Sequence, residues 1–167
     1  GFEIGLHAAG IVTVAPAEID KGACRILERR FPDLPNLGDV RDIDKEALRK
    51  LPAIDLVVGG FPCQDLSVAG KQAGIHEGER SSLWFEMLRI FDASGATWLL
   101  AENVPGLLSG KDDDDQADDE GVSGQGPLEH GPSGPVRSWF GALLRSLAER
   151  GLQYSWRVLD ARHLGVP

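Results

Sequence analysis

Apolar and polar positions follow two rhythms along the chain, and their order predicts an α/β fold. Short apolar runs typical of strands are separated by stretches in which apolar residues recur every three or four positions, as in amphipathic helices. Strands are expected at 11–15, 37–40, 54–58, 97–101 and 154–159. Helices are expected at 2–10, 20–31, 44–50, 82–92 and 136–150. This alternation predicts a mostly parallel, Rossmann-like sheet with helices on both faces.

A Gly-, Pro- and Asp-rich segment at about 110–135 interrupts this pattern and contains the run DDDDQADDE at 112–120. A segment with so few apolar side chains cannot bury enough surface to offset the entropy of ordering, so it predicts a flexible acidic insert. The run holds seven of the carboxylates behind the net charge of −9, and the rest of the chain carries only −2. The overall acidity is therefore local and does not exclude a nucleic-acid partner.

Length and composition predict one partial domain from the cytoplasm of a prokaryotic or phage-infected cell. The chain has 167 residues, of which 42% are hydrophobic. It lacks a secretory segment and any apolar run near the roughly 20 residues that span a bilayer. Cys24 and Cys63 lie far apart, and neither the cysteines nor the four histidines have metal-ligand spacing, so we expect free thiols and no metal site. Both ends fall inside element-like patterns, so we expect truncation at both ends.

Chemically useful residues follow four of the expected strands. They are, in chain order, Glu18, Asp39, Cys63 and Glu102. Because ligands of open parallel sheets bind at the carboxyl ends of the strands, these side chains are expected along one edge. Taken singly, each acid is more often a helix cap or turn residue, and a free cysteine is more often a small buried apolar group.

The stretch GGFPCQDLSVAG at 59–70 favours a functional cysteine. Pro62 fixes one backbone dihedral before Cys63, whose thiolate could be stabilised by nearby amides or a helix N-terminus. The loop from Gln64 to Arg80 is polar and interrupted by glycines, so it can move over a ligand.

Three segments resemble the central part of the DNA (cytosine-5)-methyltransferases. They are GGFPCQDLSVAGKQAG at 59–74, ERSSLWFEMLRI at 79–90 and AENVPGLLS at 101–109. Further similar segments are GFEIGLHAAG at 1–10, PAEID at 16–20, GDVRDI at 38–43 and YSWRVLDARHLGVP at 154–167. The resemblance covers nearly the whole chain outside the acidic insert.

The resemblance implies that Cys63 attacks C6 of the target cytosine while Glu102 hydrogen-bonds N3 and the exocyclic amine. Covalent addition turns C5 into an enamine carbon able to take a methyl group from a sulfonium donor. Pro62 and Asn103 are expected to shape the cytosine pocket.

The same resemblance implies that the target base is flipped out of double-stranded DNA, because a stacked base cannot present its face to a thiol. Candidate DNA contacts in the loop after Cys63 are Gln64, Ser67, Lys71, Gln72 and Arg80. The family's target-recognition domain is absent from this chain, so the recognition sequence is not readable. Implied partners are the DNA and, in restriction–modification systems, a cognate restriction endonuclease, with a monomeric complete enzyme and no membrane.

The implied cofactor is S-adenosylmethionine. Glu18 resembles the acid that accepts the ribose hydroxyls, and Asp39 resembles the acceptor for the adenine amino group, with Val40 against the ring. Ile19 stands where the family often has a bulky aromatic residue. Phe2 and Pro62 complete the expected cofactor contacts.

Alternative functions remain open at this stage. An RNA cytosine-5 methyltransferase would share the Pro-Cys and Glu-Asn-Val elements. A non-catalytic subunit, or half of a split methyltransferase, is a candidate of another class. A nicotinamide-dependent oxidoreductase is less well supported, because the Pro-Cys-Gln strand end has no role in such an enzyme.

Overall fold

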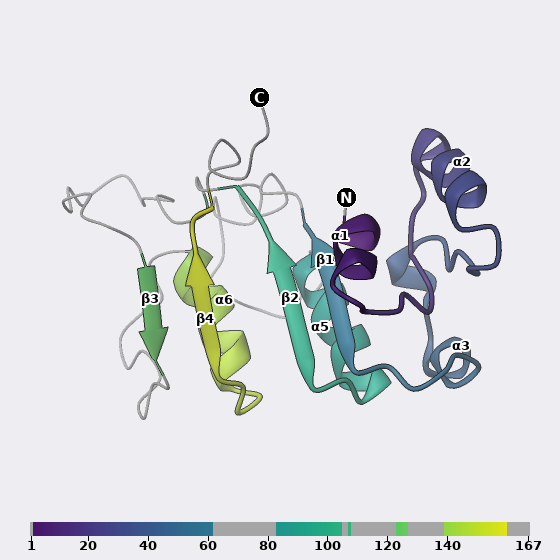
Figure 1. Cartoon of the computed structure of the whole chain (residues 1–167). Helices are drawn as coiled ribbons and strands as arrows, with labels where there is room; N and C mark the ends of the chain where they lie inside the picture. Colours follow the sequence, from purple (N-terminus) through teal and green to yellow (C-terminus); the bar gives the residue numbers. More distant parts are fainter. Residues whose placement is uncertain (1, 62–82, 105–106, 108–122, 127–138, 160–167) are drawn as a thin grey trace. The chain divides into compact units, whose positions relative to one another are not determined.

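The structure is a computed structural model that describes residues 2–61, 83–104, 107, 123–126 and 139–159 (Figure 1). It divides into two compact units, Gly1–Asn103 and Val104–Pro167. The first unit contains α1 (Phe2–Ala8), α2 (Lys21–Arg30), the 3-10 helix η1 (Val40–Asp42), α3 (Lys45–Arg49), β1 (Leu56–Gly60), α5 (Leu83–Ser94) and β2 (Trp98–Glu102). The second contains β3 (Ser123–Gly126), α6 (Trp139–Ala148) and β4 (Tyr154–Arg157).

Strands β1 and β2 form a parallel pair in the first unit. Their register runs from Leu56 opposite Trp98 to Gly60 opposite Glu102. Helix α5, whose buried face includes Met87 and Leu88, packs against β1. A Cβ on Gly59 would lie 3.0 Å from the Met87 sulfur, so a glycine lets the helix approach the strand closely. Helix α5 thus fixes the position of β1, the strand that pairs with β2.

Aspartates begin several of the helices, because their side chains accept hydrogen bonds from N–H groups without an intrahelical partner. Asp20 Oδ1 accepts from Gly22 N and Ala23 N at the start of α2, at 2.9 and 2.8 Å. Asp44 Oδ1 accepts from Ala47 N at 2.7 Å in α3, and Asp39 caps η1. These caps explain why helices follow polar turns along the first half of the chain.

The sequence predictions are confirmed for the helices and for the strands β1, β2 and β4, with small shifts of their ends. The strands expected at 11–15 and 37–40 are wrong. Residues 11–20 form no regular element, and Val12 is 79% exposed. In the segment 37–40, Gly38 has a φ of +74°, and the chain then enters η1, which Asp39 caps. This glycine turn and cap are incompatible with an extended strand.

The second unit contains an antiparallel strand pair that the sequence patterns did not indicate. Strand β3 pairs with β4, with Gly126 opposite Tyr154. The strand lies within the segment expected to be a flexible insert, and its sequence SGQG lacks the apolar alternation typical of a strand. Trp156 of β4 packs edge-on against Phe140 of α6, with ring centroids 5.1 Å apart. In the described ranges no helix is both long and apolar enough to cross a membrane.

Candidate active site

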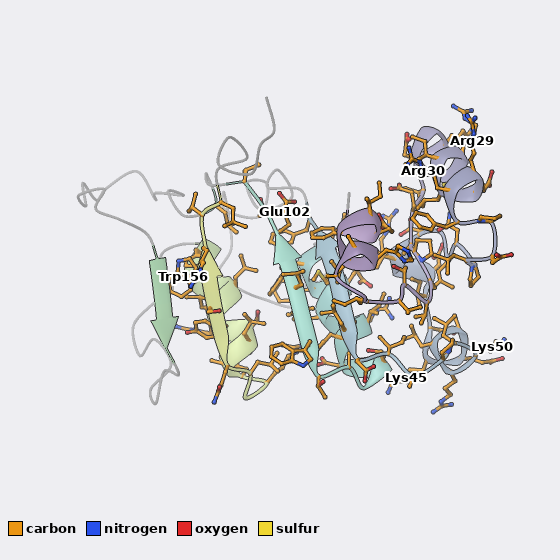
Figure 2. The ribbon with its side chains drawn as sticks, in the orientation of Figure 1. Arg29, Arg30, Lys45, Lys50, Glu102 and Trp156 are labelled. Carbon is orange, nitrogen blue, oxygen red and sulfur yellow. The ribbon has the colours of Figure 1, made fainter. Side chains whose placement is uncertain are left out.

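Glu102 lies at the carboxyl end of β2, directly opposite Gly60 at the end of β1 (Figure 2). A Cβ on Gly60 would be 3.0 Å from Glu102 Oε2 and 3.7 Å from the Glu102 carbonyl oxygen. A side chain larger than glycine would therefore displace the carboxylate unless the backbone shifted. Gly60 gives Glu102 the space it occupies.

The two strand ends are also tied together one residue further along the chain. Asn103 Nδ2 donates a hydrogen bond to the carbonyl oxygen of Phe61 at 2.8 Å. The Phe61 ring is buried and packs on Trp84 of α5, with centroids 5.2 Å apart. Both contacts fix Phe61, the last described residue before Cys63 in the sequence, next to the end of β2.

Glu18 is held by the backbone that follows it. Its Oε1 accepts hydrogen bonds from Ile19 N and Asp20 N, both at 2.8 Å. Its Oε2 makes no hydrogen bond within the part of the chain that the structure describes. The neighbouring Ile19 side chain is 64% exposed. The loop thus presents an oriented acceptor oxygen next to an apolar surface.

The Glu18 loop lies beside the loop that leads to Asp39. The Asn36 side chain accepts from Glu18 N and donates to the Glu18 carbonyl oxygen, both at 3.0 Å. Leu37 N donates to the carbonyl oxygen of Pro16 at 2.8 Å. Segments far apart in the sequence therefore meet here through Asn36 and Leu37. The strand-end argument does not account for this meeting, because neither loop follows a strand.

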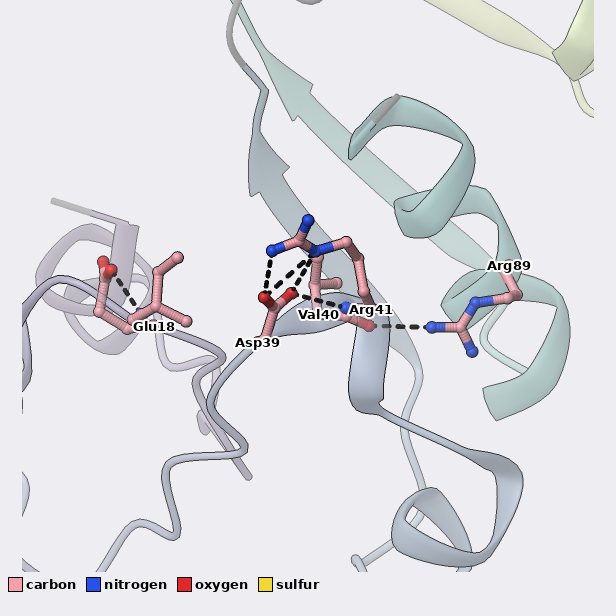
Figure 3. A network of polar contacts seen from close by, with 6 residues as sticks. Glu18, Asp39, Val40, Arg41 and Arg89 are labelled. Carbon is pink, nitrogen blue, oxygen red and sulfur yellow. Dashed lines mark hydrogen bonds and ion pairs between the residues drawn. The ribbon is translucent and has the colours of Figure 1, made fainter. Parts of the chain in front are cut away.

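Asp39 forms an ion pair with Arg41 at the start of η1 (Figure 3). Asp39 Oδ1 accepts from Arg41 N at 3.0 Å and from Arg41 Nε at 2.9 Å, and Oδ2 accepts from Nη2. These hydrogen bonds from Arg41 lower the pKa of Asp39 from 3.8 to about 2 and raise the pKa of Arg41. Asp39 is consequently an ionised acceptor at neutral pH.

Helix α5 supports the same turn through Arg89. Arg89 Nη1 donates to the carbonyl oxygen of Ile43 at 2.6 Å, and Nη2 donates to that of Val40 at 2.9 Å. Glu86 Oε2 accepts from Arg89 Nε at 2.7 Å and so orients the guanidinium. Figure 3 shows this arginine reaching η1 from α5.

Removal of the Arg41 guanidinium is expected to raise the pKa of Asp39 from about 2 toward 3.8. Because the folded-state pKa is depressed, the ion pair stabilises the fold above the ordinary value of 3.8, and this contribution is lost as the pH falls through about 2. Carboxyl ¹³C titration of Arg41→Gln measures the shift. Lys50→Gln, which breaks an exposed pair with Glu46, is the control. Equal Asp39 midpoints in both variants would contradict the assignment.

The remaining predicted site residues divide into described and undescribed positions. Phe2 begins α1 and is half-buried, and Val40 is a half-buried residue of η1. Outside the described residues lie Pro62, Cys63, Gln64, Ser67, Lys71, Gln72 and Arg80. Sequence reasoning missed Asn36 and Arg89, because their contacts join segments far apart in the sequence. It also missed Arg41, which pairs with Asp39 two positions away.

Comparison with known proteins adds independent findings. The sequence model described as C-5 cytosine-specific DNA methylase matches residues 1–119. The Type II methyltransferase M2.BsuMI of Bacillus subtilis (strain 168) is 33% identical over 171 residues, covering all of this chain and 36% of that protein. The Type II methyltransferase M.NlaIV of Neisseria lactamica is 30% identical over 169 residues, covering all of this chain and 35% of that protein. For M.Eco47II of Escherichia coli the identity is 41% over 110 residues, with 65% of this chain and 26% of that protein covered. The chain thus spans about a quarter to a third of the length of these relatives.

Proposed function

Because this chain belongs to the C-5 cytosine-specific DNA methylase family, we propose that it forms the cofactor- and cytosine-binding part of a methyltransferase. The reaction is transfer of a methyl group from S-adenosylmethionine to C5 of cytosine in DNA. The observation that supports the proposal is the register of β1 and β2, which sets Gly60 opposite Glu102. In the sequence, Pro-Cys-Gln follows β1 at 62–64.

Cys63 and Glu102 divide the chemistry between them. The Cys63 thiolate forms a bond to C6, and the electron pair of the C5–C6 double bond moves toward N3, where Glu102 stabilises it by hydrogen bonding. C5 becomes an enamine carbon and forms the new bond to the methyl group, while the bond from that methyl group to the sulfonium sulfur breaks and its electron pair stays on the departing thioether. Loss of the C5 proton and elimination of the thiolate then restore the ring. The bond of Asn103 to Phe61 supports this division, because it ties the residue after β1 to the residue after Glu102.

The substrate is a cytosine flipped out of the duplex, because the thiol must reach the face of the ring. Gln64, Ser67, Lys71, Gln72 and Arg80 in the loop after Cys63 are proposed to contact the displaced nucleotide and its phosphates. The relatives' designation as type II methyltransferases supports a restriction–modification setting, with a cognate endonuclease as partner.

The described residues fit S-adenosylmethionine. Glu18 Oε2 is available to accept from ribose hydroxyl groups, ionised Asp39 can accept from an adenine amino group, and exposed Ile19 offers apolar contact. When bound, the cofactor supplies an electrophilic methyl group. The protein's part is to orient it, and the hydrogen bonds of Asn36 and Arg89 to the two loops support that role.

Glu18→Ala is expected to raise the Kd for S-adenosylmethionine by about 10- to 100-fold, since charge-assisted hydrogen bonds contribute roughly 1.5–3 kcal/mol each. Isothermal titration calorimetry on the complete polypeptide that carries this sequence measures the change. The control is Glu46→Ala, which removes an exposed carboxylate of α3 that pairs with Lys50. A Kd within twofold of the wild type in Glu18→Ala would contradict the ribose-binding role.

The function itself is tested by incubating the complete polypeptide with methyl-labelled S-adenosylmethionine and duplex DNA, followed by nucleoside analysis. The proposal requires label in 5-methylcytosine. Label in N4-methylcytosine or N6-methyladenine would contradict the assigned chemistry. Label in RNA under conditions that leave DNA unlabelled would assign the enzyme to an RNA substrate.

A further inference from the structure

The Asn36 side chain makes every hydrogen bond that an amide group can make. Oδ1 accepts from Glu18 N at 3.0 Å and from Gly38 N at 3.2 Å. Nδ2 donates to the Glu18 carbonyl oxygen at 3.0 Å and to Cys24 Sγ at 3.4 Å. Two acceptor and two donor positions are the full capacity of the group. An exposed side chain with all four positions in use is strongly oriented by its surroundings.

These bonds connect the Glu18 loop with the loop that leads to Asp39, at the residues that determine the geometry of both loops. Asn36 contacts both the N–H and the C=O of Glu18, so it fixes the peptide planes on either side of that residue. It also contacts the N–H of Gly38, whose φ of +74° turns the chain directly before Asp39. A single side chain thereby sets the position of the Glu18 backbone relative to the Asp39 turn.

Cys24 of α2 completes the arrangement. Its Sγ donates to the same Glu18 carbonyl oxygen at 3.3 Å and accepts from Asn36 Nδ2. The Glu18 carbonyl oxygen therefore receives two side-chain donors, one from α2 and one from the loop before η1. The second cysteine of the chain thus has a structural role distinct from that proposed for Cys63.

We propose that Asn36 is a positioning residue for cofactor binding, which acts through Glu18 with Cys24 as its partner. This inference rests on the proposed function, because it assigns a cause to the orientation of the ribose-binding carboxylate. Glu18 Oε1 is bonded to Ile19 N, and Asn36 holds the carbonyl oxygen of the same peptide, so the direction of the Glu18 side chain depends on a peptide that Asn36 orients. Loss of Asn36 would leave Cys24 as the one side-chain donor to that carbonyl oxygen and loosen the direction of Oε2.

Asn36→Ala is expected to raise the Kd and KM for S-adenosylmethionine about tenfold, with kcat at saturating cofactor and KM for DNA within twofold of the wild type. Cys24→Ala, which leaves one of the two donors to the Glu18 carbonyl oxygen, is expected to raise the cofactor Kd about threefold. The milder variant keeps the test usable if Asn36→Ala does not fold. The measurements use the complete polypeptide, with calorimetry for Kd and steady-state kinetics for KM and kcat.

A double-variant cycle separates positioning from simple stabilisation. If Asn36 acts through Glu18, then adding Asn36→Ala to Glu18→Ala raises the Kd by less than twofold. The matched control is Asp44→Ala, which removes another exposed side-chain bond to the backbone of the first unit and is expected to leave the cofactor Kd unchanged.

Three results would overturn the inference. In the first, both Asn36→Ala and Cys24→Ala bind cofactor as tightly as the wild type. In the second, the effects of Asn36→Ala and Glu18→Ala multiply, so that Asn36 acts independently of Glu18. In the third, Asp44→Ala weakens cofactor binding as much as Asn36→Ala. Failure of the proposed cofactor is recognised separately, because the wild-type protein would then not bind S-adenosylmethionine at all.

Discussion

Replacement of Cys63 by alanine is expected to abolish methyl transfer, with a fall in kcat of about 10⁴-fold or more. Cytosine C5 is not nucleophilic enough to attack a methyl donor until C6 has been saturated, and the proposed function assigns that addition to the Cys63 thiolate. Steady-state methylation of duplex DNA measures the loss. Cys63→Ser is expected to behave similarly, because a hydroxyl group is a far poorer nucleophile than a thiolate at neutral pH.

Binding measurements provide the control for this prediction. The Kd for S-adenosylmethionine should stay within twofold of the wild type in Cys63→Ala, since the cofactor contacts are assigned chiefly to the loops of Glu18 and Asp39. Turnover above one-hundredth of the wild-type rate in Cys63→Ala would contradict covalent catalysis by this residue. Loss of both turnover and cofactor binding would instead indicate a structural role for the cysteine.

Glu102→Gln is expected to lower kcat by about 10²- to 10³-fold, the usual effect of removing one group that stabilises charge developing in the transition state. A glutamine fits the space that Gly60 provides beside Glu102 Oε2, so the substitution changes chemistry more than shape. The amide group of the glutamine cannot share a proton with N3 of the cytosine. The activated C6 adduct would therefore be less stable, and attack by Cys63 would slow.

The matching measurements for Glu102→Gln are kcat and the KM for each substrate. The exposed Glu149, directly after α6, supplies the control variant Glu149→Gln, for which no change is expected. An unchanged kcat in Glu102→Gln would contradict a role for Glu102 in the catalytic step. A raised KM for the cofactor with a normal kcat would indicate that Glu102 acts in cofactor binding and not in the chemical step.

The sequence predicted much of the fold because its helices and several of its strands have clear apolar patterns. The run from Ile54 to Val58 and the amphipathic pattern of α5 are examples, and β1 and α5 lie where these patterns indicated. The predicted strand at 37–40 failed because a glycine with positive φ and an aspartate cap decide the local structure there. Strand β3 could not be predicted, because SGQG becomes a strand by pairing with β4 rather than by its own propensity.

The candidate site shows the same limit. The sequence order and the family resemblance predicted four candidate site residues, which are Glu18, Asp39, Cys63 and Glu102. The supporting contacts could not be predicted from the sequence, because Arg89 lies 49 positions from Val40 and Asn36 lies 18 positions from Glu18. A single sequence carries no local pattern for such long-range bonds.

Covalent capture of the enzyme on DNA tests the central claim most directly. The complete polypeptide is incubated with S-adenosylmethionine and duplex DNA that contains 5-fluorocytosine, in which fluorine prevents loss of the C5 substituent and blocks release of the thiolate. The account predicts a protein–DNA adduct that survives denaturation with the wild type and is absent with Cys63→Ala. An adduct formed equally by Cys63→Ala, or no adduct from a wild-type protein that methylates unmodified DNA, would contradict attack of Cys63 on C6.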